Sequence, residues 1–188
     1  MSEIDFTPNF LKAINRLLKH VSPNEVGLLM RWNNDDNLIW TIWSERFSDG
    51  PGLAGYNRRV VTRQEIKNGK LVSCKPTTLG GHAEEIMIRS WEGFQAEAKM
   101  NEEPRTVDIF LTHSPCMDSS NAFSDDGEIW PRGCAPKLSK LIDMKGSNIE
   151  WRIAFWDYYG SFSSRSKALA AVKILEKCNN TTIYKVFN

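Results

Sequence analysis

Residues 149–187 read IEWRIAFWDYYGSFSSRSKALAAVKILEKCNNTTIYKVF, and this stretch decides the fold class. Its two ends, 149–156 and 181–187, are rich in the branched and aromatic residues that are typical of strands. Between them, apolar residues recur at helical spacing over 165–178, after a serine pair that can cap a helix. A connection of helix length favours a parallel crossover over a hairpin. The last two strands are therefore predicted to be parallel.

Hydrophobic periodicity predicts further elements of both kinds earlier in the chain. We expect strands at 26–32, 38–43 and 107–112. We also expect three helices: one that starts at Thr7-Pro8, one over 82–98 and one over 134–144. The turn-rich NNDDN segment at 33–37 joins the first two strands into a hairpin. The predicted fold class is α/β: a three-layer α-β-α arrangement of a mixed five-stranded sheet, with an N-terminal hairpin and parallel final strands, flanked by helices.

Composition limits the class of protein. The chain has 188 residues, 41% hydrophobic and 25% charged, which predicts a single globular domain over 1–188. No apolar run reaches the roughly 18 residues that a membrane span needs, and the N-terminus lacks a secretory pattern, so we expect a cytoplasmic or nuclear protein. The net charge of +1 neither demands nor excludes a polyanionic partner. The four cysteines are too few and scattered for a disulfide framework, which favours metal ligation by two of them.

The candidate metal ligands are His82, Cys116 and Cys134. A set of two cysteines and one histidine leaves the fourth tetrahedral position of zinc open to water, as in catalytic rather than structural sites. The order H-x-E followed by P-C-x-x-C is the known pattern of zinc-dependent nucleobase deaminases. Here Glu84 supplies the carboxylate, but seventeen residues, 117–133, separate cysteines that the pattern places two apart.

The chemistry that this set predicts is hydrolytic. One Zn²⁺ per chain would convert water to hydroxide near neutral pH, and Glu84 would move protons from that water to the ring nitrogen and the leaving ammonia. Each piece taken alone has a simpler interpretation. A His-x-Glu sequence is common at solvated helix ends, and a Pro-Cys at a strand end is usually a buried thiol.

Four segments resemble the AID/APOBEC group of polynucleotide cytidine deaminases, over nearly the whole length of the chain. They are HAEEIMIRSW (82–91), IFLTHSPC (109–116), GCAPKLSKLI (133–142) and IEWRIAFWDYYG (149–160). The resemblance implies a cytidine-deaminase-like fold and the deamination of cytosine to uracil in single-stranded DNA or RNA, as in nucleic-acid editing and immunity. Parallel final strands are typical of this group, whereas deaminases of free cytidine have an antiparallel pair.

The resemblance also implies substrate contacts from Asn57, Ala83, Ser114, Trp156, Asp157 and Tyr158. In that group, the matching residues hold the target sugar (Asn57), the pyrimidine edge (Ser114) and the base (Trp156), and Asp157 selects the nucleotide on the 5′ side. Two alternatives stay open. Trp156 and Tyr158 fit core packing at a strand end, and Asn57 fits an ordinary loop.

Three features depart from the family pattern. His113 stands where the family usually has a tryptophan, which would alter stacking against the base. The segment 117–133 is acidic, and beside the zinc it would repel a phosphate backbone or cover the pocket as a lid. The basic residues that could contact nucleic acid are few, and a solvated loop is an equal alternative for them: Arg58, Arg59, Arg63, Lys67 and Lys70.

Three functions remain open at this stage. The first is deamination of cytosine in single-stranded nucleic acid, and the second is deamination of a free nucleoside, nucleotide or modified base, with the acidic segment excluding polymers. The third is a zinc-stabilised binding protein without turnover. Polynucleotide binding should weaken steeply with salt, whereas nucleoside binding should barely respond.

Overall fold

The computed structural model describes residues 6–21, 25–44, 59–61, 64–67, 70–73, 77–79, 82–117, 123–125, 128–160 and 164–186. The helices are α1 (Pro8–His20), α2 (Ala83–Arg89), α3 (Trp91–Glu97), α4 (Cys134–Lys145) and α5 (Arg165–Glu176). The strands of the main sheet are β1 (Gly27–Trp32), β2 (Ile39–Trp43), β7 (Thr106–His113), β10 (Glu150–Asp157) and β11 (Thr181–Lys185). The shorter strands are β3 (Arg59–Val61), β4 (Gln64–Lys67), β5 (Lys70–Ser73), β6 (Thr77–Leu79), β8 (Phe123–Asp125) and β9 (Glu128–Trp130).

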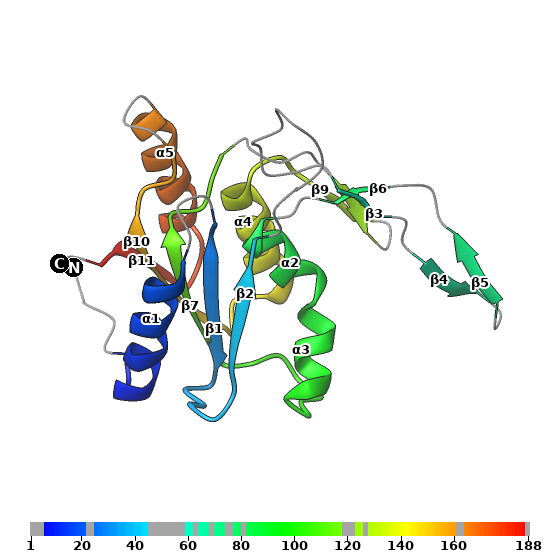
Figure 1. Cartoon of the computed structure of the whole chain (residues 1–188), viewed down its shortest axis with the longest axis horizontal. Helices are drawn as coiled ribbons and strands as arrows, with labels where there is room; N and C mark the ends of the chain where they lie inside the picture. Colours follow the sequence, from blue (N-terminus) through cyan, green and yellow to red (C-terminus); the bar gives the residue numbers. More distant parts are fainter. Residues whose placement is uncertain are drawn as a thin grey trace.

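A mixed five-stranded sheet forms the centre of the molecule, in the order β11-β10-β7-β1-β2. Strands β1 and β2 form an antiparallel hairpin, and β1 also pairs antiparallel with β7. Strands β7, β10 and β11 are parallel to one another (Figure 1). The predicted class, with its N-terminal hairpin and parallel final strands, is confirmed.

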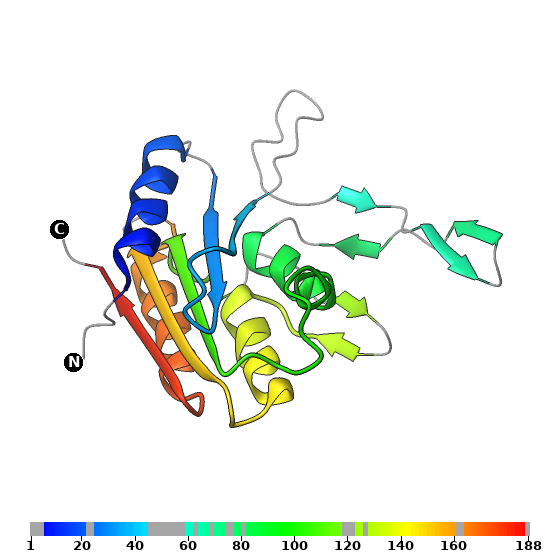
Figure 2. The same cartoon turned by 90° about the horizontal axis from the view of Figure 1, so that it is seen from below.

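Helices cover both faces of this sheet (Figures 1 and 2). On one face, α1 packs against a cluster that includes Leu29, Phe110 and Ala154. On the other face, helices α2 to α5 pack against the alternate residues of the same strands, such as Met30 and Ile109. Because successive side chains of a strand point to opposite faces, this alternation creates two separate apolar layers. The three-layer prediction is therefore correct.

Helix α1 follows directly from its sequence. Thr7 is the N-cap, and its Oγ1 accepts the backbone N–H of Phe10 at 3.3 Å, while Pro8 occupies the first helical position. Phe10, Ile14 and Leu17 recur every three or four residues and are buried against the sheet. Full burial of each such side chain contributes roughly 1.5–3 kcal/mol, which fixes α1 on its face of the sheet.

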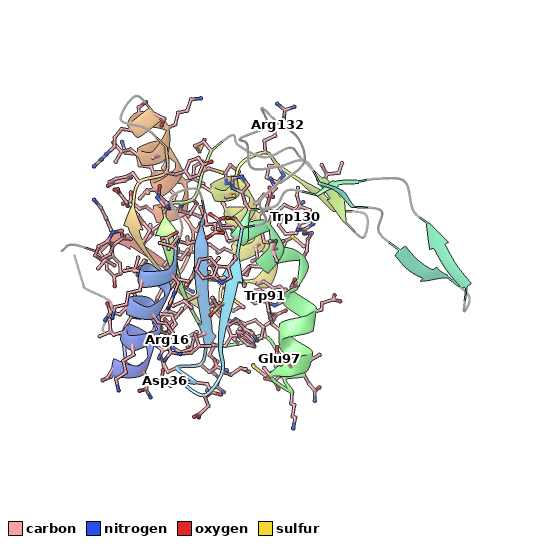
Figure 3. All side chains as sticks on the ribbon, viewed as in Figure 1. Arg16, Asp36, Trp91, Glu97, Trp130 and Arg132 are labelled. Atoms are coloured by element: carbon pink, nitrogen blue, oxygen red, sulfur yellow. The ribbon has the colours of Figure 1, made fainter. Side chains whose placement is uncertain are left out.

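The single helix predicted over 82–98 is wrong, because the structure breaks it at Ser90 into α2 and α3. The backbone of Ser90 (φ −97°, ψ 4°) leaves the helical region, and the chain changes direction there. The turn brings Trp91 against Trp32, with ring centroids 4.8 Å apart, and Trp91 Nε1 donates to Glu103 at 2.9 Å. Figure 3 labels Trp91 and Glu97 on α3. A tryptophan cluster thus holds α3 against the sheet.

The remaining expectations have mixed outcomes. The segment 117–133, predicted as an inserted loop, contains the β8–β9 hairpin. The stretch after β2 contains two further hairpin-like pairs, β3–β6 and β4–β5, which extend away from the main sheet in both views (Figures 1 and 2). Among the described residues, none of the helices combines the length and apolar composition that crossing a membrane requires.

Candidate metal centre

Three buried side chains from separate parts of the chain meet at one end of the sheet: His82, Cys116 and Cys134. Their ligand atoms lie within 4.8 Å of one another, and His82 Nδ1 is 3.8 Å from Cys116 Sγ. His82 is the N-cap of α2, Cys116 follows strand β7, and Cys134 is the first residue of α4. The three ligands expected from the sequence are therefore brought together.

The seventeen-residue separation between the cysteines does not keep them apart, because Met117 and Gly133, the two ends of the segment, lie in contact. Gly133, with φ 81°, packs so closely on Met117 that a Cβ atom would collide with the Met117 carbonyl oxygen. The backbone N–H of Ala135 donates to the carbonyl oxygen of Cys116 at 2.9 Å, and the N–H of Cys134 donates to Cys116 Sγ at 3.4 Å. The start of α4 is thus docked on the Cys116 loop.

This donor set fits a metal ion. Imidazole nitrogen and thiolate sulfur lie about 2.0–2.3 Å from zinc, so a tetrahedral nitrogen–sulfur pair lies about 3.6 Å apart. The 3.8 Å between His82 Nδ1 and Cys116 Sγ is close to this separation. Burial, and then the Cys116 sulfur, raise the pKa of the Cys134 thiol well above its usual value. A cation that binds both sulfurs would lower the pKa of the Cys134 thiol again, because it stabilises two adjacent thiolates. The buried group can therefore coordinate a metal ion.

Glu84 lies in the same buried region, in the first turn of α2. Its side chain is 2% exposed, and its Oε2 has no hydrogen-bond partner among the described residues. Burial, and then the charge of Cys116, raise the pKa of Glu84 to about 7. A buried carboxylate oxygen without a hydrogen-bond partner destabilises the folded state, so its presence points to a functional rather than a stabilising role.

Sequence reasoning missed the neighbouring residue, Glu85. Its Oε1 lies 3.1 Å from Lys137 Nζ, and neither side chain is exposed. Its Oε2 accepts the backbone N–H of His82 at 3.3 Å. Glu85 therefore links the residue that carries the imidazole to helix α4, which carries Cys134. The sequence signal for this pair was a charged residue three positions after a candidate ligand: Glu85 after His82, and Lys137 after Cys134.

Ser114 connects the metal centre to the end of β10. Its N–H donates to the carbonyl oxygen of Asp157 at 2.7 Å, and its Oγ accepts the N–H of Tyr159 at 3.0 Å. The Tyr159 ring lies 6.2 Å from the His82 ring, which makes Tyr159 an aromatic neighbour of the centre that the sequence analysis did not single out. Ala83, predicted to contact substrate, is fully buried at the start of α2.

The residues before Tyr159 lie in different surroundings. Trp156 packs with the cluster on the α1 face, whereas the candidate metal ligands lie on the other face beside Ala83 and Ala135. Asp157 is exposed; the N–H of Tyr158 lowers its pKa, and Lys185 lies 3.5 Å away. The guanidinium of Arg165 lies 4.1 Å from the centre of the Tyr158 ring.

His113, the residue that departs from the family pattern, ends β7 opposite Asp157. It is half-buried, and its Nδ1 lies 3.3 Å from Thr112 Oγ1. Burial lowers the pKa of His113, although the charge of Asp157 opposes this. The residue therefore favours its neutral form more than an exposed histidine does.

Several predicted contacts lie outside the described residues. Asn57, Arg58 and Arg63 are among them, and the side chain of Arg59 in β3 is not described, so the basic patch stays a prediction. At the end of the 117–133 segment, Trp130 is buried and Lys140 Nζ lies 5.3 Å from its ring, while Arg132 is exposed (Figure 3).

Comparison of the sequence with protein-family models and with curated proteins gives no match. The fold and the site therefore define the class by themselves. This is an α/β protein with helices on both faces of a mixed sheet and a buried His-Cys-Cys group that can hold a metal ion at the end of β7.

Proposed function

We propose that this protein is a zinc-dependent deaminase that converts cytosine to uracil in single-stranded DNA or RNA. The observation that carries the proposal is Glu84: a buried carboxylate, with an oxygen that has no hydrogen-bond partner among the described residues, beside two cysteines and a histidine. Structural zinc sites have no need of such a carboxylate, whereas hydrolytic sites use one for proton transfer.

His82, Cys116 and Cys134 would hold the ion, since two thiolates and one imidazole suit zinc better than hard cations. Zinc, when bound, supplies a Lewis acid that makes water nucleophilic near neutral pH. Glu85 keeps α2 and α4 together around these ligands through Lys137 and the His82 N–H.

Glu84 moves the protons of the reaction. Water forms a new bond to C4 of cytosine and gives one proton to Glu84, which passes it to ring nitrogen N3. Glu84 then carries the second proton of the water to the amino group, the C4–N4 bond breaks, and ammonia leaves uracil behind. A carboxyl group with a pKa of about 7 can both accept and donate a proton near neutral pH.

The preference for a polynucleotide rests on the resemblance in four segments and on the parallel β10–β11 pair, which is typical of the polynucleotide group. Single strands are the expected form, because a base must leave the stack to reach a buried site.

The test is uracil formation from single-stranded oligodeoxynucleotides, oligoribonucleotides and free cytidine. We expect Glu84→Gln to abolish turnover and Glu92→Gln to leave it unchanged, since Glu92 is an exposed glutamate on α3. Uracil formation that survives Glu84→Gln would overturn the mechanism. Turnover of free cytidine, without turnover of either oligonucleotide, would show that the substrate is a free nucleoside rather than a nucleic acid.

Metal content tests the ligands separately. We expect about one zinc per chain, lost in Cys134→Ala and kept in Cys178→Ala, because Cys178 instead donates to Ser139 Oγ at 3.3 Å. Bound zinc without turnover of any of these substrates would favour a binding protein that uses the metal only for stability.

A further inference from the structure

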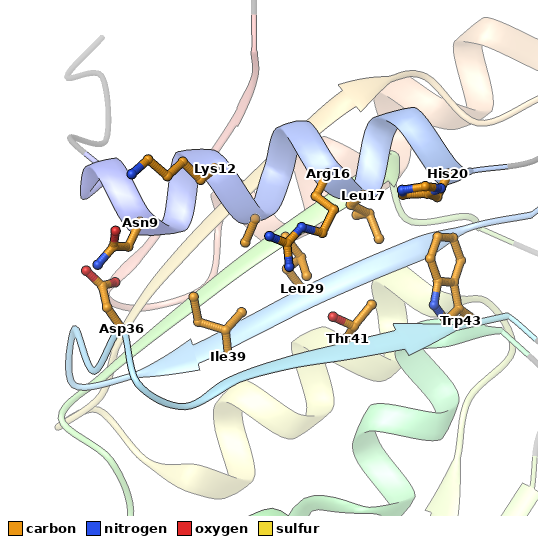
Figure 4. Close-up of a pocket in the computed structure, with 11 residues that line it drawn as sticks. Asn9, Lys12, Arg16, Leu17, His20, Leu29, Asp36, Ile39, Thr41 and Trp43 are labelled. Atoms are coloured by element: carbon orange, nitrogen blue, oxygen red, sulfur yellow. The ribbon is translucent and has the colours of Figure 1, made fainter.

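A groove lies between helix α1 and the β1–β2 hairpin, on the opposite face of the sheet from the metal ligands. It encloses about 500 Å³. Lys12, Arg16 and His20 come from the helix wall, and Thr41 and Trp43 come from β2 (Figure 4). Figure 4 shows the guanidinium of Arg16 reaching from the helix toward the strands, and His20 and Trp43 at the same end of the groove.

The helix wall of the groove carries the positive charges of Lys12 and Arg16. Lys12, Arg16 and His20 are spaced by four residues, so they share one face of α1 about 6 Å apart along its axis. All three are exposed, and α1 contains no Asp or Glu. Within the ranges that the structure describes, no hydrogen bond or ion pair engages the side chain of Lys12 or Arg16. Their charge is available to a ligand.

The one acidic side chain in the lining is already engaged. Asp36 lies beside Asn9 at the far end of the groove (Figure 4) and forms an ion pair with Arg31. Thr7 Oγ1 also donates to Asp36 at 2.7 Å. Arg31 is fully buried and also pairs with Asp108, which in turn pairs with Arg152. The charge that the groove presents to a ligand is therefore positive.

The rest of the groove is apolar or aromatic. Leu29 and Ile39 line it from the strands, and Trp43 is half-buried beside His20. The two cations Lys12 and Arg16 next to an aromatic side chain form the combination with which proteins bind single-stranded nucleic acids: the cations contact the phosphates and the ring stacks on a base. An acidic peptide would use the cations alone.

The groove leads toward the end of the sheet that holds the metal ligands. Trp43 pairs with Gly27, whose N–H donates to Thr112 Oγ1 at 3.1 Å. Thr112 stands two residues before Ser114 and four before Cys116. A single-stranded nucleic acid that leaves the groove at Trp43 therefore emerges at the end of the sheet where Ser114 and Cys116 follow β7.

We infer that this groove is a second binding site for single-stranded nucleic acid, with phosphates on Lys12 and Arg16 and a base against Trp43. The inference rests on the proposed function for its ligand, and it adds a site that holds the polymer away from the reacting base. It uses no residue of the metal centre.

Binding of a labelled single-stranded oligothymidylate of roughly 10–16 nucleotides tests the site. We expect Arg16→Glu to weaken binding at least tenfold and to lower the slope of log affinity against log salt by about one. Lys19→Glu is the matched control, because it makes the same charge change on the same helix outside the groove lining. Equal effects of the two substitutions would overturn the inference.

The aromatic contact is tested with the same probe. Trp43→Leu should weaken binding roughly 5- to 100-fold, and Trp43→Phe should retain most of it, because stacking needs a ring. Urea denaturation of both variants separates lost binding from lost folding. An oligoglutamate peptide that binds as tightly, and is weakened equally by Arg16→Glu, would overturn the assignment to nucleic acid.

Turnover separates this inference from the proposed function. Arg16→Glu should raise the KM for an oligonucleotide and leave the deamination of any free cytidine unchanged. Oligonucleotide turnover that Arg16→Glu does not alter would overturn the groove and leave the deaminase intact. Loss of oligonucleotide binding in Arg16→Glu, in a protein without turnover, would support the groove and overturn the deaminase.

Discussion

Lys137 and Glu85 form a fully buried ion pair, with Nζ 3.1 Å from Oε1, that joins the two helices carrying candidate metal ligands. Each partner stands three residues after a ligand: Glu85 after His82 on α2, and Lys137 after Cys134 on α4. Residues three apart share a helix face, so the pair acts close to both ligands. It therefore fixes the spacing between the imidazole and the second thiol.

Removing one partner should be costly. Lys137→Met leaves Glu85 buried without its cation, and we expect a loss of about 3–5 kcal/mol in the free energy of unfolding. Urea denaturation measures it. Lys145→Met is the control on the same helix, because Lys145 pairs with Glu103 at 2.6 Å but both are partly exposed, which limits the loss to about 1 kcal/mol. Similar losses in both variants would contradict a special role for the buried pair.

The double substitution separates stability from metal binding. Glu85→Met with Lys137→Met should recover most of the lost stability, since apolar side chains replace buried ion pairs well. Zinc affinity should stay about 10- to 100-fold lower, because the His82 N–H loses its acceptor and the ligand loses its orientation. Chelator competition measures this; full recovery of affinity would show that the pair only stabilises the fold.

Gly133 should be irreplaceable at the point where the 117–133 segment closes. Gly133→Ala adds a Cβ atom that collides with the Met117 carbonyl oxygen, which should displace Cys134 and lower zinc affinity. Gly146→Ala is a matched control: Gly146 ends α4 with a similar φ of 88°, and a Cβ there meets no atom within 4 Å. Both share a backbone penalty on the order of 1–3 kcal/mol. Equal zinc affinity in the two variants would contradict the close approach.

The mixed pairing of the main sheet was predictable because it depends on local sequence patterns. A helix-length connection between strand-like runs predicts parallel β10 and β11, and the turn-rich 33–37 segment predicts the β1–β2 hairpin. The break at Ser90 was not predictable from periodicity. It depends on Trp91 reaching Trp32 and Trp151, which lie far away in sequence.

The grouping of His82, Cys116 and Cys134 was predictable because their residue types are specific to metal sites, whereas their neighbours were not predictable. Helices cover both faces of the sheet, so apolar and polar residues do not alternate in a way that marks the face of the site. The sequence pattern therefore does not tell which of Trp156 and Tyr159 faces the site. In the structure Tyr159 lies near His82, whereas Trp156 packs on the α1 face. Lys137 belongs to an amphipathic helix, and its burial depends on Glu85, a contact that pattern alone does not reveal.

Trp130 should anchor the β8–β9 hairpin to α4. It is 6% exposed, and Lys140 both lies over its ring and donates to the carbonyl oxygen of Ile129 at 2.7 Å. Trp130→Ala should cost about 3–5 kcal/mol and expose the 117–133 segment to proteolysis at Arg132. Ile129→Ala, at a side chain that is 73% exposed, should change neither. A hairpin equally resistant in both variants would contradict this anchoring.

Glu84→Gln should make the protein more stable while it removes the proposed chemistry. Burial raises the pKa of Glu84 to about 7, so the unfolded chain releases this proton at lower pH than the folded chain. The folded state therefore loses stability as pH rises from the usual glutamate pKa through about 7, and the loss levels off above that pH, once the buried charge is formed. Replacing it with a neutral amide should gain on the order of 1–3 kcal/mol, more at about pH 8 than at about pH 5. Urea denaturation at both pH values measures the gain. Glu92→Gln, at an exposed position, should show no such dependence, and a Glu84→Gln protein that is less stable than the parent at the higher pH would mean that the carboxylate serves the fold rather than a reaction.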